Sequence, residues 1–316
     1  MSSASPPGPR IYRSKDIQPL IPRNESVWQY YLRCNPDLVP DDKVILQEQE
    51  NPSVQVTYGE MREKASKGAA GLQKLLGLKE GDVIAIWVHY LHVAEAQVFF
   101  ADSVLIAKFR EAQRLDASGR LSQLRVVSLD AGVPGQTDIP QWPQDFLGVG
   151  SAPVLDLSNR DNKTVPAVIC FSSGTSGSPK GALLSHHSMI GYVTGPRCFG
   201  SSALNRNDVD VFYAPLCHIY GMVAAVLAPA FIGHLMVIMR AYKFHEYIKA
   251  CQENQATIMR VVPPAAMAIA KDPSMRDLNL SSVHTLVCAG AALGEETQAG
   301  LQRLLKNMAA EACSRL

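Results

Sequence analysis

The sequence lacks both an excess of charge of one sign and any long hydrophobic run. Its 316 residues carry 30 Lys and Arg against 29 Asp and Glu, a formal net charge of +1. This balance argues against a nucleic-acid-binding or polybasic membrane surface. No apolar run approaches the ~20 residues that a membrane-spanning helix needs. The N-terminal segment MSSASPPGPR also lacks the apolar core of a secretory signal.

Paired cysteines are missing as well. The seven cysteines are odd in number, scattered along the chain and contain no CxxC pair. We therefore expect reduced thiols, most of them in the core, in an intracellular protein.

Segments of strand and helix character alternate along the chain, which indicates an α/β fold. We expect mostly parallel, doubly wound sheets with flanking helices and with ligands at the carboxyl ends of the strands. The β-rich runs predict strands over residues 83–88, 98–105, 124–129, 167–171, 182–184, 209–213, 234–239, 257–262 and 284–288. Helical spacing of apolar residues predicts helices over residues 26–33, 58–76, 108–115, 187–194, 219–231, 244–252, 264–270 and 294–306.

These segments divide the chain into three parts. Residues 1–26 are rich in Pro and Ser and are expected to be extended. Residues 27–150 would form a first α/β subdomain and residues 151–316 a second. Residues 131–163, rich in Gly, Pro, Asp and Asn, read as a loop between the two.

One segment between two predicted strands, Ile169–Ser188 (ICFSSGTSGSPKGALLSHHS), has the composition of an anion-binding loop. Glycines let backbone N–H groups approach an anion, hydroxyl groups supply further donors, and a lysine adds positive charge. The loop is therefore suited to a polyphosphate. A flexible Ser/Gly linker is the alternative, but linkers rarely lie between two strands or end in Pro-Lys-Gly. The phosphate loop of kinases and GTPases does not match, because Pro179 precedes the lysine and Gly181 follows it.

Three segments together carry a resemblance to the adenylate-forming superfamily. Residues 172–181, SSGTSGSPKG, resemble the phosphate loop of its acyl- and aryl-CoA ligases, luciferases and peptide-synthetase adenylation domains. Residues 215–221, PLCHIYG, resemble the segment lining the acyl pocket in the CoA-ligase branch, which includes 4-coumarate-CoA ligase-like enzymes. Residues 287–294, VCAGAALG, are similar to the family's loop beside adenine. The resemblance implies the large N-terminal domain of these enzymes.

The resemblance also implies roles for individual residues. ATP phosphates would be bound by Ser172, Ser173, Gly174, Thr175, Ser176 and Gly177. Thr175 would also lie near a Mg²⁺ ion, which prefers phosphate, water and one or two protein oxygens. Lys180 would either screen phosphate charge or fix the loop. Gly290, Ala291 and Ala292 would offer adenine a flat surface, or form a tight strand-to-helix turn, or both.

His218 is the candidate for contact with the acyl group, and a core histidine bonded to a backbone carbonyl is its alternative. Tyr220 and Gly221 would shape the same pocket wall, with plain packing as the favoured interpretation for Tyr220. The implied catalytic residues are thus His218, Thr175 and Lys180. The implied reaction joins a carboxylate to ATP and then transfers the acyl group to the thiol of coenzyme A. The apolar stretch after Gly221, MVAAVLAPAF, is expected in the core; if it also borders the acyl pocket, it favours an aryl or fatty acid over acetate.

Parts of the family pattern are missing. Only nine residues separate Val88 from Val98, too few for a parallel crossover with its helix. We expect an internal deletion near residues 89–98, with an antiparallel or edge placement of one strand as the alternative. The family's Gly-Tyr-Gly-x-Thr-Glu and Thr-Gly-Asp segments and its C-terminal domain with a catalytic lysine are not found. A truncated, inactive relative is therefore the alternative to a working ligase.

The last three residues, Ser314-Arg315-Leu316, resemble the Ser-Lys-Leu peroxisomal address. The expected partner is then the peroxisomal import receptor and the expected location the peroxisome, with the cytoplasm as alternative. The branch that the chain resembles further suggests fungal secondary metabolism.

Overall fold

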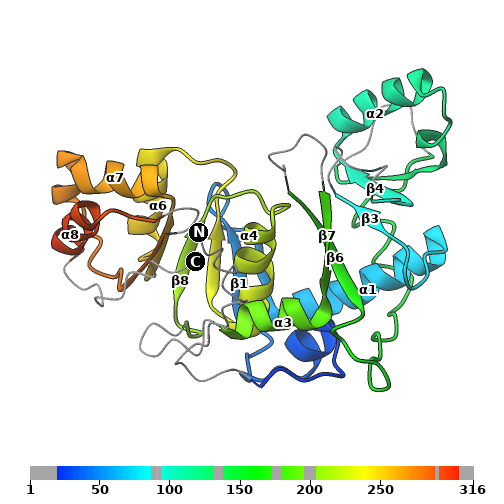
Figure 1. The fold of residues 1–316 in the computed structure, drawn as a ribbon, viewed down its shortest axis with the longest axis horizontal. Helices are drawn as coiled ribbons and strands as arrows, with labels where there is room; N and C mark the ends of the chain where they lie inside the picture. Colours follow the sequence, from blue (N-terminus) through cyan, green and yellow to red (C-terminus); the bar gives the residue numbers. More distant parts are fainter. Residues whose placement is uncertain are drawn as a thin grey trace, which may run out of the picture.

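The structure, a computed structural model, describes residues 20–86, 91, 94–130, 138–172, 180–195, 204–288 and 292–305. A six-stranded sheet forms its centre, with the strands in the order β11-β10-β8-β9-β1-β2 (Figure 1). All neighbouring pairs are parallel except β1 with β2, which is antiparallel at one edge. The strands are β1 (Val44–Glu48), β2 (Gln55–Thr57), β8 (Val209–Phe212), β9 (Leu235–Ile238), β10 (Ile258–Val261) and β11 (Thr285–Cys288). The predicted parallel α/β architecture is confirmed.

Helices cover both faces of this sheet. One face is packed against α6 (Phe244–Glu253), α7 (Pro263–Lys271) and α8 (Glu295–Leu304). The other face carries α3 (His186–Thr194) and a continuous helical run made of α4 (Ile219–Gly221), η6 (Met222–Leu227) and α5 (Ala228–Ile232). Figure 1 shows α4 standing between the six-stranded sheet and the pair of strands β6 and β7. No helix in the described part of the chain is long and apolar enough to cross a lipid bilayer.

A smaller parallel sheet has the order β3-β4-β5, with β3 (Ile84–Ala85), β4 (Val98–Ala101) and β5 (Arg125–Ser128). The C-terminal end of α1 (Tyr58–Leu76) covers one face and α2 (Ser103–Leu115) the other. The boundaries of α1 match the prediction because both ends carry local signals. Thr57 and Glu60 form a reciprocal capping box at the start, and Gly77 adopts a φ of 58° at the end.

The connection between β3 and β4 is short, as the sequence indicated. The two strands pair in parallel, Ile84 opposite Val98, so the antiparallel alternative is wrong, whereas β3 does lie at the edge of its sheet. Of the strand predicted as buried over residues 83–88, Ile84 and Ala85 form β3, Ile86 beyond it is 64% exposed, and residues 87 and 88 lie outside the described residues. The missing internal segment stays a prediction.

Other elements depart from the predictions. α2 begins at Ser103 instead of Lys108, because the side chain of Asp102 accepts a hydrogen bond from the backbone N–H of Leu105 and caps the helix. β1 and β2 were not predicted from the sequence. Both belong to the six-stranded sheet, which therefore extends across the boundary expected near residue 150.

β6 (Pro166–Ser172) and β7 (Lys180–Ser185) form an antiparallel hairpin in which Ser172 lies opposite Lys180. Both strands were predicted, each slightly shorter. The loop that joins them, residues 173–179, lies outside the described residues.

Candidate functional site

The topology of the six-stranded sheet defines one position where its strand order reverses. After β8 the chain crosses one face through α4, η6 and α5 to reach β9, and after β9 it crosses the other face through α6 to reach β10. β8 and β10 are therefore neighbours whose following helices lie on opposite faces. In open α/β sheets, ligands bind in the crevice outside the carboxyl ends of such strands.

The two strands separate at this crevice. Their pairing ends at Met259 opposite Val211, whereas β10 remains paired with β11 as far as Val261. The hydroxyl of Tyr247, from α6, lies at this position. It accepts a hydrogen bond from the backbone N–H of Arg260 and donates one to its carbonyl, both at 2.9 Å. The backbone N–H and carbonyl of Arg260 are thus paired with a side chain instead of with the neighbouring strand.

The PLCHIYG segment follows β8 directly and so lies at the crevice. His218 is the N-cap of α4, and its exposed ring accepts a hydrogen bond at Nδ1 from the backbone N–H of Tyr220, at 3.1 Å. The alternative of a core histidine bonded to a carbonyl is wrong, because the ring is exposed and accepts from an amide. His218 is therefore held at the helix terminus with its remaining surface available to a ligand.

Gly221 is needed for close packing of this segment. A Cβ placed on Gly221 would lie 2.1 Å from the carbonyl oxygen of Pro215 and 2.7 Å from Cα of Leu216. The helix therefore contacts the backbone of its own leading loop, which fixes where His218 lies.

Replacing Gly221 by Ala is expected to lower the free energy of unfolding by about 1–3 kcal/mol, because backbone and not a flexible side chain must move. The denaturant midpoint measures this loss. Gly195→Ala is the matched control, since nothing lies within 4 Å of its Cβ position and its φ is −52°. Equal midpoints for the two variants would contradict the close packing.

Tyr220 lies on the sheet side of α4. Its ring is 5.4 Å from that of Phe212, and burial raises the pKa of its hydroxyl while Arg260 opposes the rise. Arg260 in turn is paired with Asp210 of β8, Nε to Oδ2 at 2.5 Å, and their side chains are 10% and 0% exposed. Two charged residues thus lie beneath the segment predicted to line the acyl pocket.

The remaining predicted residues are only partly placed. Lys180 is exposed at the start of β7, opposite the backbone of Ser172. Ala292 is exposed between β11 and α8, also at the carboxyl end of the sheet. Ser173, Gly174, Thr175, Ser176, Gly177, Gly290, Ala291 and the tripeptide 314–316 lie outside the described residues. Nowhere in the described ranges are three or more His, Cys, Asp or Glu residues grouped as metal ligands.

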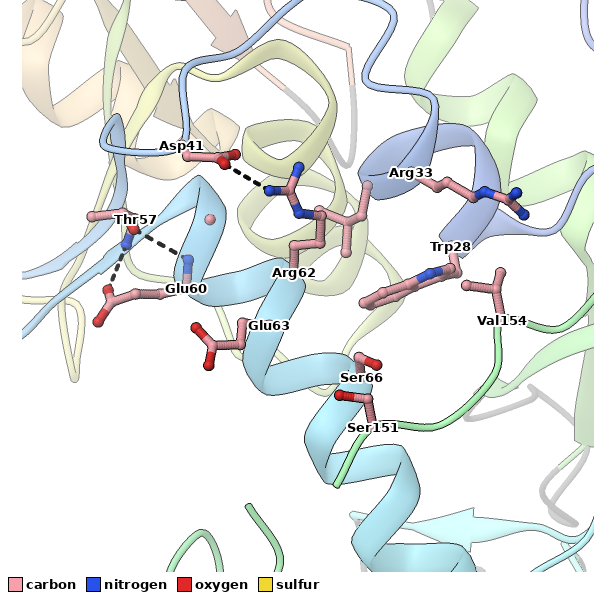
Figure 2. A pocket seen from close by; sticks show the side chains of 12 residues that line it. Trp28, Arg33, Asp41, Thr57, Glu60, Arg62, Glu63, Ser66, Ser151 and Val154 are labelled. Atoms are coloured by element: carbon pink, nitrogen blue, oxygen red, sulfur yellow. Dashed lines mark hydrogen bonds and ion pairs between the residues drawn. The ribbon is translucent and has the colours of Figure 1, made fainter. Parts of the chain in front are cut away.

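A groove of about 820 Å³ lies elsewhere, along the start of α1 (Figure 2). Trp28 and Val154 form its apolar part, and Arg62 is paired with Asp41 at 2.7 Å while Glu60 is engaged in the helix cap. None of its lining residues belongs to the three motif segments. We therefore place the candidate site at the crevice.

Comparison with known proteins decides the family. Residues 87–312 match the family model described as "AMP-binding enzyme". The chain belongs to this family. 4-Coumarate–CoA ligase 3 of Arabidopsis thaliana is 30% identical over 331 residues, which cover 95% of this chain and 57% of the relative. 4-Coumarate–CoA ligase CCL1 of Humulus lupulus is 26% identical over 79% of this chain and 50% of its own length.

This AMP-binding chain therefore spans about half the length of the curated relatives that it matches. Solved structures agree on the fold. A red-emitting luciferase from Phrixothrix hirtus superposes with a TM-score of 0.73 at 20% identity, covering 92% of this chain and 61% of the luciferase. The anthranilate CoA ligase AuaEII, in complex with anthranoyl-AMP, gives 0.73 at 16% identity over 90% and 59% of the two chains.

Sequence reasoning missed the polar residues beneath the motif. Asp210 pairs with Arg260, and Tyr247 is hydrogen-bonded to the backbone of Arg260. None of the three was a candidate. The available signal was a single charge inside each of two otherwise apolar strands, VDVF and IMRV. Charged residues are almost never fully buried unless they are paired, so a charge inside an apolar strand indicates that an oppositely charged partner lies nearby.

Proposed function

We propose that this chain binds ATP at the β6–β7 hairpin and a carboxylic acid at the β8–β10 crevice, and that it activates the acid as an acyl-adenylate for transfer to coenzyme A. The observation that supports this best is the convergence of two motif segments at the carboxyl end of one sheet. PLCHIYG follows β8 there, and VCAGAALG begins in the last two residues of β11. The exposed Lys180 at the hairpin supplies a cation for the nucleotide.

The reaction requires negative charge to be stabilised twice. In the first step a carboxylate oxygen forms a bond to the α-phosphorus of ATP, and the bond to the bridging oxygen breaks, so pyrophosphate leaves. In the second the thiolate of coenzyme A forms a bond to the acyl carbon and AMP leaves. The hydroxyl and backbone donors of the loop, with Lys180, suit the phosphate oxygens, since fixed donors and cations are the main devices for phosphoryl chemistry. Mg²⁺ bound with the nucleotide would neutralise further phosphate charge.

We propose an aryl acid as the substrate class. The helical run after Gly221 packs buried apolar side chains, including Ala224 and Ala225, against the sheet, and predominantly apolar walls favour apolar ligands. Relatives named for 4-coumarate and anthranilate support the same class. A role in fungal secondary metabolism and import into peroxisomes through Ser314-Arg315-Leu316 are further proposals that rest on the sequence alone.

A second candidate function is nucleotide binding without catalysis. It is favoured by gaps inside the match, because the alignment with the Arabidopsis relative spans 331 residues, more than the 316 of this chain, so the relative carries internal residues that the chain lacks. This supports the proposed internal deletion.

Pyrophosphate exchange into ATP, measured over a panel of aromatic and aliphatic acids, separates the two functions. A ligase is expected to exchange above background with at least one acid. The Thr175→Ala, Lys180→Ala double variant should lose about 10²- to 10³-fold, as removal of single charge-stabilising donors does in other enzymes. Lys163→Ala is the matched control, because Lys163 is an exposed lysine just before β6, at the opposite end of the hairpin.

The outcomes are distinct. Exchange that disappears in the double variant and persists in Lys163→Ala supports the ligase. No exchange by a folded chain, together with calorimetric binding of ATP-Mg that needs Lys180, supports the nucleotide-binding remnant. No binding at all contradicts both.

A further inference from the structure

The ion pair of Asp210 and Arg260 lies beneath α4, at a position where apolar side chains could fill the same space. Asp210 and Arg260 are on adjacent strands and on the face that α4 and η6 cover, next to the apolar cluster of Phe212, Ala224 and Met236. Only one carboxylate oxygen is engaged, since Oδ1 of Asp210 has no hydrogen-bond partner among the described residues. Such a pair is weak evidence of a stabilising role, because burying two charges costs about as much as their attraction returns.

One residue of the motif lies beside this pair. The ring of Tyr220 is 5.4 Å from that of Phe212, which follows Asp210 by two residues on the same face of β8, and the positive charge of Arg260 opposes the rise in the pKa of the Tyr220 hydroxyl. Tyr220 in turn donates its backbone N–H to Nδ1 of His218 at 3.1 Å. The charged pair, the side chain of Tyr220 and the exposed ring of His218 therefore lie next to one another, in that order from the sheet outwards.

We propose that Arg260, held by Asp210 and by the Tyr247 hydroxyl on its backbone, is a positioning residue that sets the orientation of Tyr220 and His218 at the acyl crevice. This inference rests on the proposed function for its enzymatic consequence. Arg260 does not itself bind the acid: its charge is neutralised by Asp210 and its side chain is nine-tenths buried. Arg260 acts through Tyr220. The acyl crevice is thus positioned by a buried charged residue as well as by apolar packing.

The test compares Arg260→Lys, Tyr220→Phe and the double variant. Arg260→Lys keeps the buried positive charge beside Asp210 but removes the planar guanidinium, and Tyr220→Phe removes only the hydroxyl. Each is expected to raise the KM for the acid about tenfold with the KM for ATP unchanged, and the double variant should be no worse than either, since coupled residues are not additive. Arg240→Lys is the matched control, because Arg240 forms an exposed pair with Glu48 at 2.6 Å just after β9.

A second readout does not require ligase activity. The bond accepted at Nδ1 places the proton of the neutral His218 ring on Nε2, and nuclear magnetic resonance of isotope-labelled histidine reports this tautomer. We expect Arg260→Lys and Tyr220→Phe to shift the ring nitrogen signals of His218 in the same way, and Arg240→Lys to leave them in place. Unchanged signals in both variants would overturn the positioning role, even if the chain proves to be a ligase. Shifted signals in a chain without pyrophosphate exchange would uphold the positioning role and contradict the proposed ligase.

Discussion

Replacing Asp210 by Asn is expected to lower the free energy of unfolding by about 3–5 kcal/mol, because it leaves the buried guanidinium of Arg260 without a counter-charge. Asp210 is fully buried and Arg260 nearly so, and the pair lies in the middle of the six-stranded sheet. Burial raises the pKa of Asp210 to about 6, an effect that Arg260 opposes. At neutral pH the carboxylate is therefore ionised and the pair is intact.

The control for this prediction is Glu48→Gln. It breaks the pair between Glu48 and Arg240 at the same sheet, where the two side chains are 22% and 74% exposed. Exposed pairs contribute roughly 0–1 kcal/mol, so this variant should unfold close to the unaltered chain. Urea denaturation at pH 7.5 measures both.

Removal of both charges should be far less harmful than removal of one. Well-packed apolar residues replace buried ion pairs at little cost or with a gain, so Asp210→Leu with Arg260→Met is expected to recover most of the stability lost in Asp210→Asn. A double variant as unstable as the single one would show that packing at these positions, and not charge, sets the effect. An Asp210→Asn variant no less stable than Glu48→Gln would refute the buried pair itself.

The elements that were predictable from the sequence are those with local signals. α1 is bounded correctly by Thr57, Glu60 and Gly77, all within or next to the helix. β8, β10 and β11 are short apolar runs between turns, and the hairpin loop is framed by two such runs. The phosphate-loop motif likewise needs only neighbouring residues to be identified.

The features that were not predictable depend on contacts between distant segments. β1 joins the sheet through Leu46 opposite Met236, and nothing in the five residues VILQE indicates that partner. Arg260 and Asp210 are 50 positions apart. A charge inside an apolar strand indicates that a partner exists but not which residue it is, so the contacts beneath His218 emerge only once the strand order is known.

His234 should make the protein sensitive to acid. Its ring is fully buried at the start of β9, and neither nitrogen has a hydrogen-bond partner in the part of the chain that the structure describes. Burial, and to a smaller extent the nearby charges of Arg260 and Lys43, lowers the pKa of His234 from 6.5 to about 3. The unfolded chain therefore binds a proton at His234 that the folded chain does not, over the range from about pH 6.5 down to about pH 3.

The sign of the effect follows from this difference. The lowered pKa contributes stability that is fully present above pH 6.5 and is lost as the pH falls towards 3, in total about 5 kcal/mol at 1.36 kcal/mol per pKa unit.

His234→Leu should remove this loss of stability at low pH. The variant is expected to become more stable than the unaltered chain by about 1.4 kcal/mol for each pH unit below 6.5, reaching roughly 3 kcal/mol at pH 4. The measurement is urea unfolding of both proteins at several pH values from 4 to 7.5, and the difference between them isolates His234 because Asp210 is common to both. His245→Leu, at an exposed position on α6, should follow the unaltered chain at every pH. A difference between His234→Leu and the unaltered chain that does not change with pH would show that His234 binds protons equally in the folded and the unfolded chain. Burial would then not lower its pKa.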